Sequence, residues 1–146
     1  MDCPFCDKSQ VAERTITEND LARGFLTNAP IVPGHTLIAP KRHVTYFEGL
    51  TEEERSAIEM LRMQLHGAMK QAFRAEGFNY AWNEEKVGGQ SVPHFHLHIL
   101  PRKEGDAGVY QYEPREFIYR PIPVDKRPTS THEELTEITQ ILREAL

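Results

Sequence analysis

The spacing of apolar residues along the chain predicts one long amphipathic helix. Between Ile58 and Phe73, apolar side chains recur at the three- and four-residue spacing of a helix face. Thr51 followed by Glu54 is the pattern of an N-terminal capping box, and Gly77 stands where a helix is expected to stop. We therefore predict a helix over residues 51–76.

A second, shorter helix is predicted near the C-terminus. Thr131 and Glu134 form a similar cap, and the apolar stripe after them consists of Leu135, Ile138, Ile141 and Leu142. Segments rich in aromatic and β-branched residues predict strands at 24–27, 36–39, 78–83 and 93–100. Because helices and strands do not alternate regularly, we expect an α+β fold with an antiparallel sheet. The composition of residues 103–126 predicts no element.

Length and composition limit the possible classes of protein. A chain of 146 residues with 39% hydrophobic residues supplies one modest core, so we expect a single domain over residues 1–146. The net charge of -5 argues against a general binder of nucleic acid, which needs a basic surface. The sequence shows neither a membrane-spanning apolar run nor a signal-peptide pattern. We therefore expect a cytoplasmic protein with no nucleic-acid or membrane partner.

The most informative segment alternates three histidines with apolar residues. In an extended strand, His94, His96 and His98 would share one face, and the apolar residues between and after them would share the other. One face would pack on the core while the other presented imidazoles roughly 6–7 Å apart. Such a row fits either a metal site with imidazole ligands or covalent catalysis with one imidazole as the nucleophile.

A glycine-containing turn precedes these histidines. In the segment Gly88-Gly89-Gln90-Ser91, successive backbone N–H groups can form a concave anion site, and Gln90 and Ser91 add side-chain donors. A phosphate-binding turn that leads into a row of histidines favours the covalent interpretation, in which an imidazole attacks phosphorus.

The two cysteines, Cys3 and Cys6, are separated by two residues. This spacing lets both thiolates reach one tetrahedral metal ion. A redox pair is disfavoured, because that motif normally follows a strand and opens a helix, whereas Cys3 is the third residue of the sequence. Two unliganded thiols are the remaining alternative.

These segments resemble the histidine triad family, whose signature is three histidines alternating with apolar residues. The resemblance covers most of the chain. Residues 33–40, PGHTLIAP, resemble the family's strand before the long helix, and residues 100–106, LPRKEGD, resemble the fragile histidine triad branch of dinucleoside polyphosphate hydrolases. The resemblance implies an α+β fold and usually a homodimer. It also implies a small-molecule nucleotide substrate, cleaved at its α-phosphate by hydrolysis or nucleotidyl transfer.

The resemblance further implies individual roles at the site. His96 would be the nucleophile that forms a nucleotidyl-histidine, and His98 would contact the phosphate and protonate the leaving group. His35 is expected to support the site rather than react. The implied substrate-binding residues are Asn28, Asn83, Gly89, Gln90, Ser91, Val92 and His98.

A zinc ion is implied by the same resemblance. Many bacterial members with an N-terminal cysteine pair bind zinc through that pair, a histidine after a proline-lysine turn and the first triad histidine. The corresponding residues here are Cys3, Cys6, His43 and His94. A closed set of four ligands leaves no position for substrate, so the zinc would be structural. The fragile histidine triad branch usually lacks this pair, and the chain therefore combines features of two branches.

Two other functions are compatible with the sequence. The three alternating histidines could be ligands of a metal-dependent phosphohydrolase, although no carboxylate lies within the HFHLH run to complete such a site. Alternatively, the chain could be a nucleotide-binding signalling module whose hydrolysis is incidental.

Overall fold

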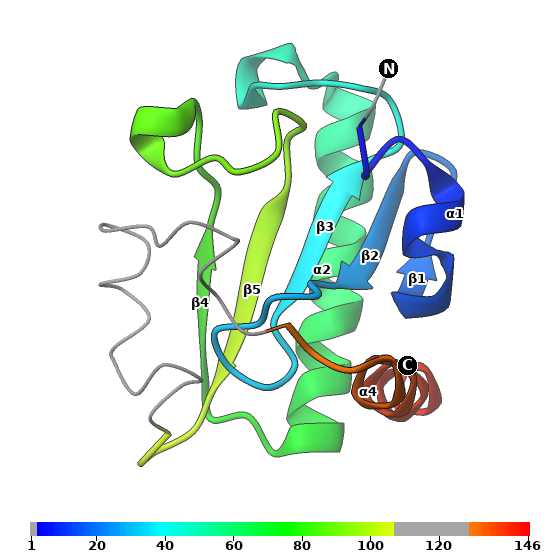
Figure 1. Cartoon of the computed structure of the whole chain (residues 1–146), viewed down its shortest axis with the longest axis vertical. Helices are drawn as coiled ribbons and strands as arrows, with labels where there is room; N and C mark the ends of the chain where they lie inside the picture. The colour runs from blue at the N-terminus through cyan, green and yellow to red at the C-terminus, as the bar shows by residue number, and fades with distance from the viewer. Residues whose placement is uncertain (1–2, 107–128) are drawn as a thin grey trace.

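A five-stranded antiparallel sheet with the order β1-β2-β3-β5-β4 organises the chain (Figure 1). The computed structural model describes residues 3–106 and 129–146, so most of the segment 103–126 lies outside the described residues. The strands are β1 Thr15–Glu18, β2 Ala22–Leu26, β3 Thr36–Pro40, β4 Gly77–Ala81 and β5 Leu97–Arg102. The predicted α+β class with an antiparallel sheet is confirmed. In the described part of the chain, no helix is long and apolar enough to cross a membrane.

The long helix α2, Glu52–Phe73, begins as the sequence predicts and ends earlier. The Thr51 side chain accepts a hydrogen bond from the Glu54 amide, and the Glu54 carboxylate accepts one from the Thr51 amide, which completes the capping box. The prediction that Gly77 ends the helix was wrong. Arg74 turns the chain in the left-handed conformation with φ 56°, which frees Gly77 to begin β4.

The main core lies between α2 and one face of the sheet. Leu61, Leu65 and Met69 of α2 are fully buried there and belong to the same cluster as Ile38 and Ile99 of the central strands. The C-terminal helix α4, His132–Glu144, has the predicted Thr131 cap and buries Leu142 in this core. Leu135 and Ile138 pack against the same core, whereas 38% of Ile141 is exposed, so the buried stripe is narrower than predicted.

The N-terminal segment covers part of the opposite face. It contains the short helix α1, Lys8–Val11, and a 3-10 turn, Ala12–Arg14, neither of which the sequence pattern predicts. Cys3, Phe5 and Val11 form a second buried cluster there with Phe25 and Leu37 of the sheet and with Ala39 of β3. The two faces of the sheet therefore have separate cores, and α2 covers only one of them (Figure 1).

The histidine segment enters the sheet later than predicted. Strand β5 begins at Leu97 rather than near Pro93, because the preceding amides bond elsewhere. The His94 amide donates to Val92 O at 2.8 Å and the Phe95 amide donates to Val44 O at 2.5 Å. The alternation persists nevertheless: Phe95, Leu97 and Ile99 lie in the core with α2, and His98 pairs with Leu37, whose side chain belongs to the other face.

Candidate functional site

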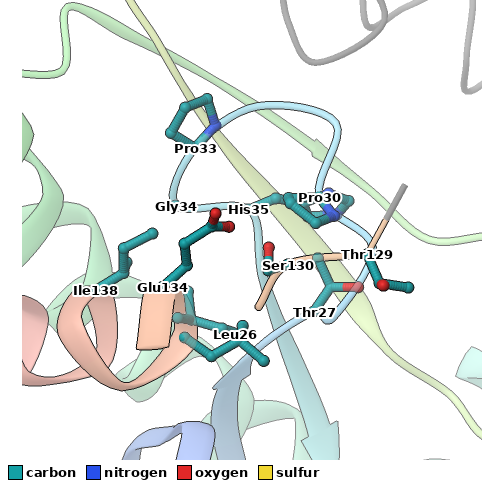
Figure 2. Close-up of a pocket in the computed structure, with 11 residues that line it drawn as sticks. Leu26, Thr27, Pro30, Pro33, Gly34, His35, Thr129, Ser130, Glu134 and Ile138 are labelled. Atoms are coloured by element: carbon teal, nitrogen blue, oxygen red, sulfur yellow. The ribbon is translucent and has the colours of Figure 1, made fainter. Parts of the chain in front are cut away.

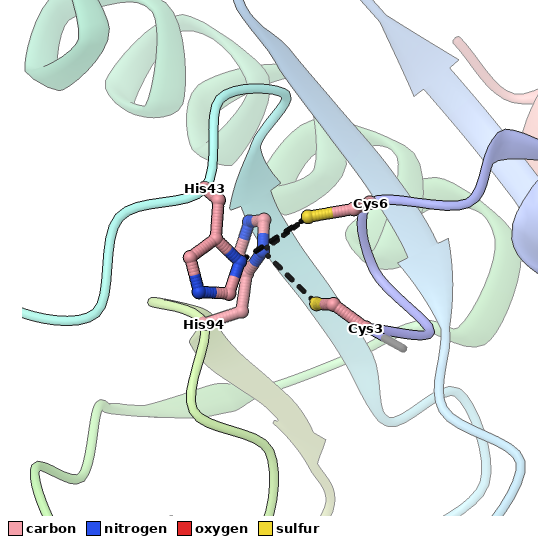
Figure 3. Close-up of side chains that lie close together, drawn as sticks. All are labelled: Cys3, Cys6, His43 and His94. Atoms are coloured by element: carbon pink, nitrogen blue, oxygen red, sulfur yellow. Dashed lines mark hydrogen bonds between the residues drawn. The ribbon is translucent and has the colours of Figure 1, made fainter. Parts of the chain in front are cut away.

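The two cysteines and two of the histidines meet beyond one end of β3 (Figure 3). Their ligand atoms all lie within 4.8 Å of one another. The Nδ1 atom of His94 lies 3.4 Å from Cys3 Sγ and 3.5 Å from Cys6 Sγ, and Nδ1 of His43 lies 3.2 Å from Cys6 Sγ. Ligand atoms of a tetrahedral zinc ion are about 3.5 Å apart, given zinc–sulfur and zinc–nitrogen distances of about 2.3 and 2.0 Å.

The ring of His94 is already in the state that a metal ligand requires. Its Nε2–H donates to the Pro40 carbonyl at 2.8 Å, which leaves the lone pair of Nδ1 directed at the thiols. Burial lowers the pKa of His94, with the bond to Pro40 opposing that effect, so the neutral form that binds metals is favoured. The side chain is completely buried.

The thiols also favour a cation at this position. Burial raises the pKa of Cys6, and the hydrogen bond and charge of Cys3 raise it further, because two thiolates repel each other at this distance. A divalent cation would compensate both negative charges and keep the thiols deprotonated. The set of two sulfur and two imidazole nitrogen ligands is one that zinc commonly adopts in closed sites.

The loop that carries His43 is attached to the beginning of α2. Arg42 makes two hydrogen bonds to the Glu54 carboxylate, at 2.7 and 3.0 Å, and a third to Gly49 O at 2.9 Å. The hydrogen bond from Arg42 is the main reason that the pKa of Glu54 is lowered, against the opposing effect of burial. Glu54 therefore both caps α2 and fixes the position of a ligand loop, which sequence reasoning did not anticipate.

His96 is buried next to this cluster. Its Nδ1 lies 2.7 Å from the carbonyl oxygen of His94, and since a carbonyl only accepts, Nδ1 carries the proton. Nε2 of neutral His96 then carries the lone pair. The ring is 4% exposed, and the ring of Phe5 stands nearly perpendicular to it with centroids 5.0 Å apart.

His98 is linked to His35 instead. The Ile31 amide donates to Nδ1 of His35 at 3.1 Å, so the hydrogen-bond network assigns the proton of neutral His35 to Nε2. That Nε2 lies 2.9 Å from Nδ1 of His98, which must accept. Neutral His98 therefore carries its own proton on Nε2. The ring centroids of His96 and His98 are 4.9 Å apart.

This arrangement argues against a metal bound by the three alternating histidines. His94 directs Nδ1 at the thiols, Nδ1 of His96 is bonded to a carbonyl, and Nδ1 of His98 is bonded to His35. The three rings thus have different hydrogen-bond partners. Among the residues that the structure describes, Cys3, Cys6, His43 and His94 form the group whose ligand atoms converge.

The glycine-containing turn offers fewer donors than its sequence suggests. The amides of Gly88 and Gln90 donate to Glu85 O, and that of Gly89 donates to Lys86 O. The Gln90 side chain donates to Thr45 O at 3.2 Å. Within the described residues, the amides of Ser91 and of Val92, which follows the turn, have no hydrogen-bond partner, so they are the donors best placed for an anion.

The two predicted asparagines have supporting positions. The Asn83 side chain donates to Gly89 O at 3.4 Å and thereby braces the glycine-containing turn. Asn28 is exposed, and its carbonyl accepts a hydrogen bond from the Ser130 amide at 2.9 Å. Asn28 thus connects the loop after β2 to the segment that leads into α4.

A cavity of about 440 Å³ lies between that loop and α4. Figure 2 shows Glu134 and Ile138 of α4 on one side of it and Pro30 and Pro33 on the other. None of the described lining residues is Lys or Arg, so the cavity does not offer the positive charge expected of a phosphate site. It is lined by Leu26, Thr27, Pro30, Pro33, Gly34, His35, Thr129, Ser130, Glu134, Leu135 and Ile138.

Residues 8–105 match the HIT domain, and the chain belongs to this family of histidine triad proteins. An uncharacterized HIT-like protein of Mycoplasma genitalium is 38% identical over 108 residues, which are 73% of this chain and 77% of the relative. A bis(5'-adenosyl)-triphosphatase of Dictyostelium discoideum is 32% identical over 124 residues, covering 85% and 79% of the two chains. The prediction of a hydrolase is therefore confirmed at the level of the family.

A solved structure supports the prediction of zinc. A zinc-bound histidine triad family protein of Mycobacterium smegmatis matches with a TM-score of 0.75 and 26% identity, over 99% of this chain and 93% of that one. This structural match extends beyond residues 8–105, the part of the chain that matches the HIT domain. Together with the converging cysteines and histidines, it supports zinc as the metal.

Proposed function

We propose that this protein hydrolyses a nucleotide at its α-phosphate, with a dinucleoside polyphosphate as the substrate class and a nucleotidyl-histidine as the intermediate. The observation that carries the proposal is the opposite placement of protons on two adjacent rings. His96 has its lone pair on Nε2, whereas His98 has its proton there. One ring is thus prepared to attack and the other to donate a hydrogen bond to the leaving oxygen.

In the first step, Nε2 of His96 forms a bond to the α-phosphorus while the bond from phosphorus to the leaving oxygen breaks. The leaving oxygen accepts a hydrogen bond from Nε2–H of His98 and departs as the anion of a nucleoside polyphosphate, and His35 keeps that donor in place because its own Nε2–H remains hydrogen-bonded to Nδ1 of His98. The modified His96 keeps its Nδ1–H on the His94 carbonyl. Negative charge on the phosphoryl oxygens would be met by the amides of Ser91 and Val92.

In the second step, water attacks the same phosphorus and the bond to His96 breaks. One proton of the water stays on the product and the other passes to solvent, while His98 keeps its proton on Nε2. His96 regains its lone pair on Nε2, so both rings return to the starting state, and a nucleoside monophosphate leaves. A nucleotidyl transferase would follow the same path with another nucleophile in place of water. The ring positions account equally well for both outcomes, and the hydrolase relatives favour water.

Zinc would be held by Cys3, Cys6, His43 and His94 as a structural ion. Bound there, it would supply positive charge to the thiolates and cross-link three separate segments of the chain. All four ligand positions come from the protein, which leaves none for substrate. The residues of this site act on the reaction only through the position of His96.

The experiment that tests the proposal is trapping of the intermediate. Wild-type protein is mixed with diadenosine triphosphate, quenched within one turnover and digested, and the peptide with residues 94–98 is examined by mass spectrometry. We expect an added nucleotidyl group on His96. The His96→Asn variant should form no adduct and lose at least about a thousandfold in kcat. Hydrolysis at a near-normal rate by this variant would overturn the covalent mechanism.

We also propose that the chain forms a homodimer through the groove between α2 and β4. Tyr80 and Trp82 are 38% and 44% exposed there, and they line a hollow of about 300 Å³ with Phe47, Phe95 and Leu97. Among the described strands, β4 pairs only with β5 and forms one edge of the sheet. An exposed aromatic groove beside a sheet edge favours a second copy as its occupant, since both copies can bury the same residues.

Sedimentation tests the dimer. We expect twice the chain mass for wild type and a single-chain mass for Trp82→Asp. The matched control is Val87→Asp, which changes a 99% exposed apolar residue outside the groove and should leave the dimer intact. A wild-type protein that sediments as a single chain at micromolar concentration would contradict the proposal.

A further inference from the structure

Phe5 lies between the two cysteines in sequence and contacts the histidines of both sites. Its ring centroid is 5.0 Å from that of His96 and 5.9 Å from that of His94, in both cases with the planes nearly perpendicular. On another side it packs against Phe25 with centroids 5.2 Å apart. Only 7% of Phe5 is exposed, so it offers little surface to a substrate.

The position of Phe5 is set by the cysteine turn. The Cys6 amide donates to Cys3 O at 3.1 Å, and both sulfur atoms face Nδ1 of His94. A residue confined between two such neighbours has little freedom to move its backbone. The Phe5 ring is therefore held against His96 for as long as the cysteine turn keeps its shape.

Packing adds to the hydrogen bond that holds His96. The hydrogen bond from Nδ1 to the His94 carbonyl sets the position of the proton, whereas the tilt of the ring depends on the groups packed against it. A perpendicular aromatic ring at 5.0 Å restricts the tilt by packing, in the edge-to-face arrangement that aromatic pairs favour. The hydrogen bond comes from His94 of the cysteine–histidine cluster, and the perpendicular ring comes from Phe5, the residue between Pro4 and Cys6 of the cysteine turn.

We propose that Phe5 is a positioning residue for His96, held in place by the cysteine turn. This inference rests on the proposed function, because it concerns the direction in which His96 attacks. A ring displaced by a fraction of an ångström attacks more slowly, although the substrate still binds. Movement of the cysteine turn would then also move the ring of His96. We expect substitution of Phe5 to lower kcat and to leave KM unchanged.

The test compares zinc-loaded wild type with Phe5→Leu, which keeps an apolar side chain but removes the ring. Four quantities are measured: zinc content, the rate of nucleotidyl-His96 formation in a single turnover, the Kd of adenosine monophosphate, and the long-range ¹H–¹⁵N NMR signals of the His96 ring. We expect full zinc content, an unchanged Kd, adduct formation slower by about tenfold or more, and broadened or shifted His96 signals. Phe5→Ala should enlarge each change.

Val11→Ala is the matched control, since it removes buried apolar volume from the same cluster without a ring contact to His96. The proposal is overturned if Phe5→Leu forms the adduct at the wild-type rate, if its defect lies in Kd, or if Val11→Ala reproduces it. Failure of wild type to form an adduct would instead overturn the proposed function. In that case the His96 signals of Phe5→Leu still decide the positioning role: unchanged signals reject it and altered signals support it.

Discussion

The two ends of the histidine segment differ more in their hydrogen-bond partners than in their sequence. At one end, His94 is completely buried and directs Nδ1 at two thiols while Nε2 donates to Pro40. At the other end, His98 is half-buried and its Nδ1 accepts from His35. Equal spacing along the chain thus produces a ring that faces two thiols at one end and a ring that accepts a hydrogen bond from another histidine at the other, because the groups that each ring meets decide where its proton resides.

The largest expected effect concerns the His94 end. The Cys3→Ser variant should lose zinc and lower the free energy of unfolding by more than about 4 kcal/mol, since one removed ligand opens a site that joins three segments. Metal analysis and denaturant unfolding measure both quantities. His35→Leu is the control at the other end and should keep its zinc. If the Cys3→Ser protein keeps its full zinc content and its stability, the proposal that the His94 end holds a structural zinc ion would be wrong.

The next effect concerns the His98 end. His35→Leu removes the donor that fixes the tautomer of His98, and we expect kcat for a dinucleoside polyphosphate to fall about a hundredfold. Adenosine monophosphate has no leaving group, so its Kd should change much less. An equal loss in the affinity for adenosine monophosphate would contradict a role of the His35–His98 pair toward the leaving oxygen.

The smallest effect concerns the support of His43. Glu54→Gln weakens the bonds to Arg42, and we expect a loss of about 1–2 kcal/mol in the free energy of unfolding at pH 7. The bond from Arg42 lowers the pKa of Glu54 below its usual 4.5 in the folded state. The contribution of the Glu54 carboxylate to the free energy of unfolding is therefore complete above pH 4.5. It disappears as the pH falls through the pKa that Glu54 has in the folded protein.

Unfolding curves of wild type and Glu54→Gln between pH 7 and pH 3 measure this effect, because their difference cancels the titrations that the two proteins share. The difference should shrink below pH 4.5. Glu52→Gln is the matched control, since Glu52 is an exposed residue of the same helical turn. A difference that is constant over the whole range would contradict the assigned role of Glu54.

Local patterns predicted where the two longer helices, α2 and α4, begin. The reciprocal bonds of Thr51 and Glu54 lie within four residues of each other, so sequence spacing alone defines the cap of α2. The end of α2 could not be predicted in the same way. Arg74 adopts a left-handed conformation that favours glycine or asparagine, and the residue type gives no sign of it.

The alternation of histidines and apolar residues predicted which side chains share a face. It did not predict which ring nitrogen of each histidine carries the proton. The bond between His35 and His98 joins residues 63 positions apart, and the bond between Arg42 and Glu54 depends on how a loop packs on a helix. Strand β1 has too few apolar residues to be predicted, since only Ile16 of its four residues is buried. Spacing indicates which residues share a face, whereas their partners depend on the tertiary structure.

The separation of the cysteines and His94 along the chain has a consequence for folding kinetics. Cys3 and His94 are 91 positions apart, and the β-sheet that brings them together includes strands from both halves of the intervening segment. Closing so long a loop is entropically costly until the sheet itself forms. We therefore expect tight zinc capture to be a late event during refolding, so that its rate reports completion of the sheet rather than initial collapse.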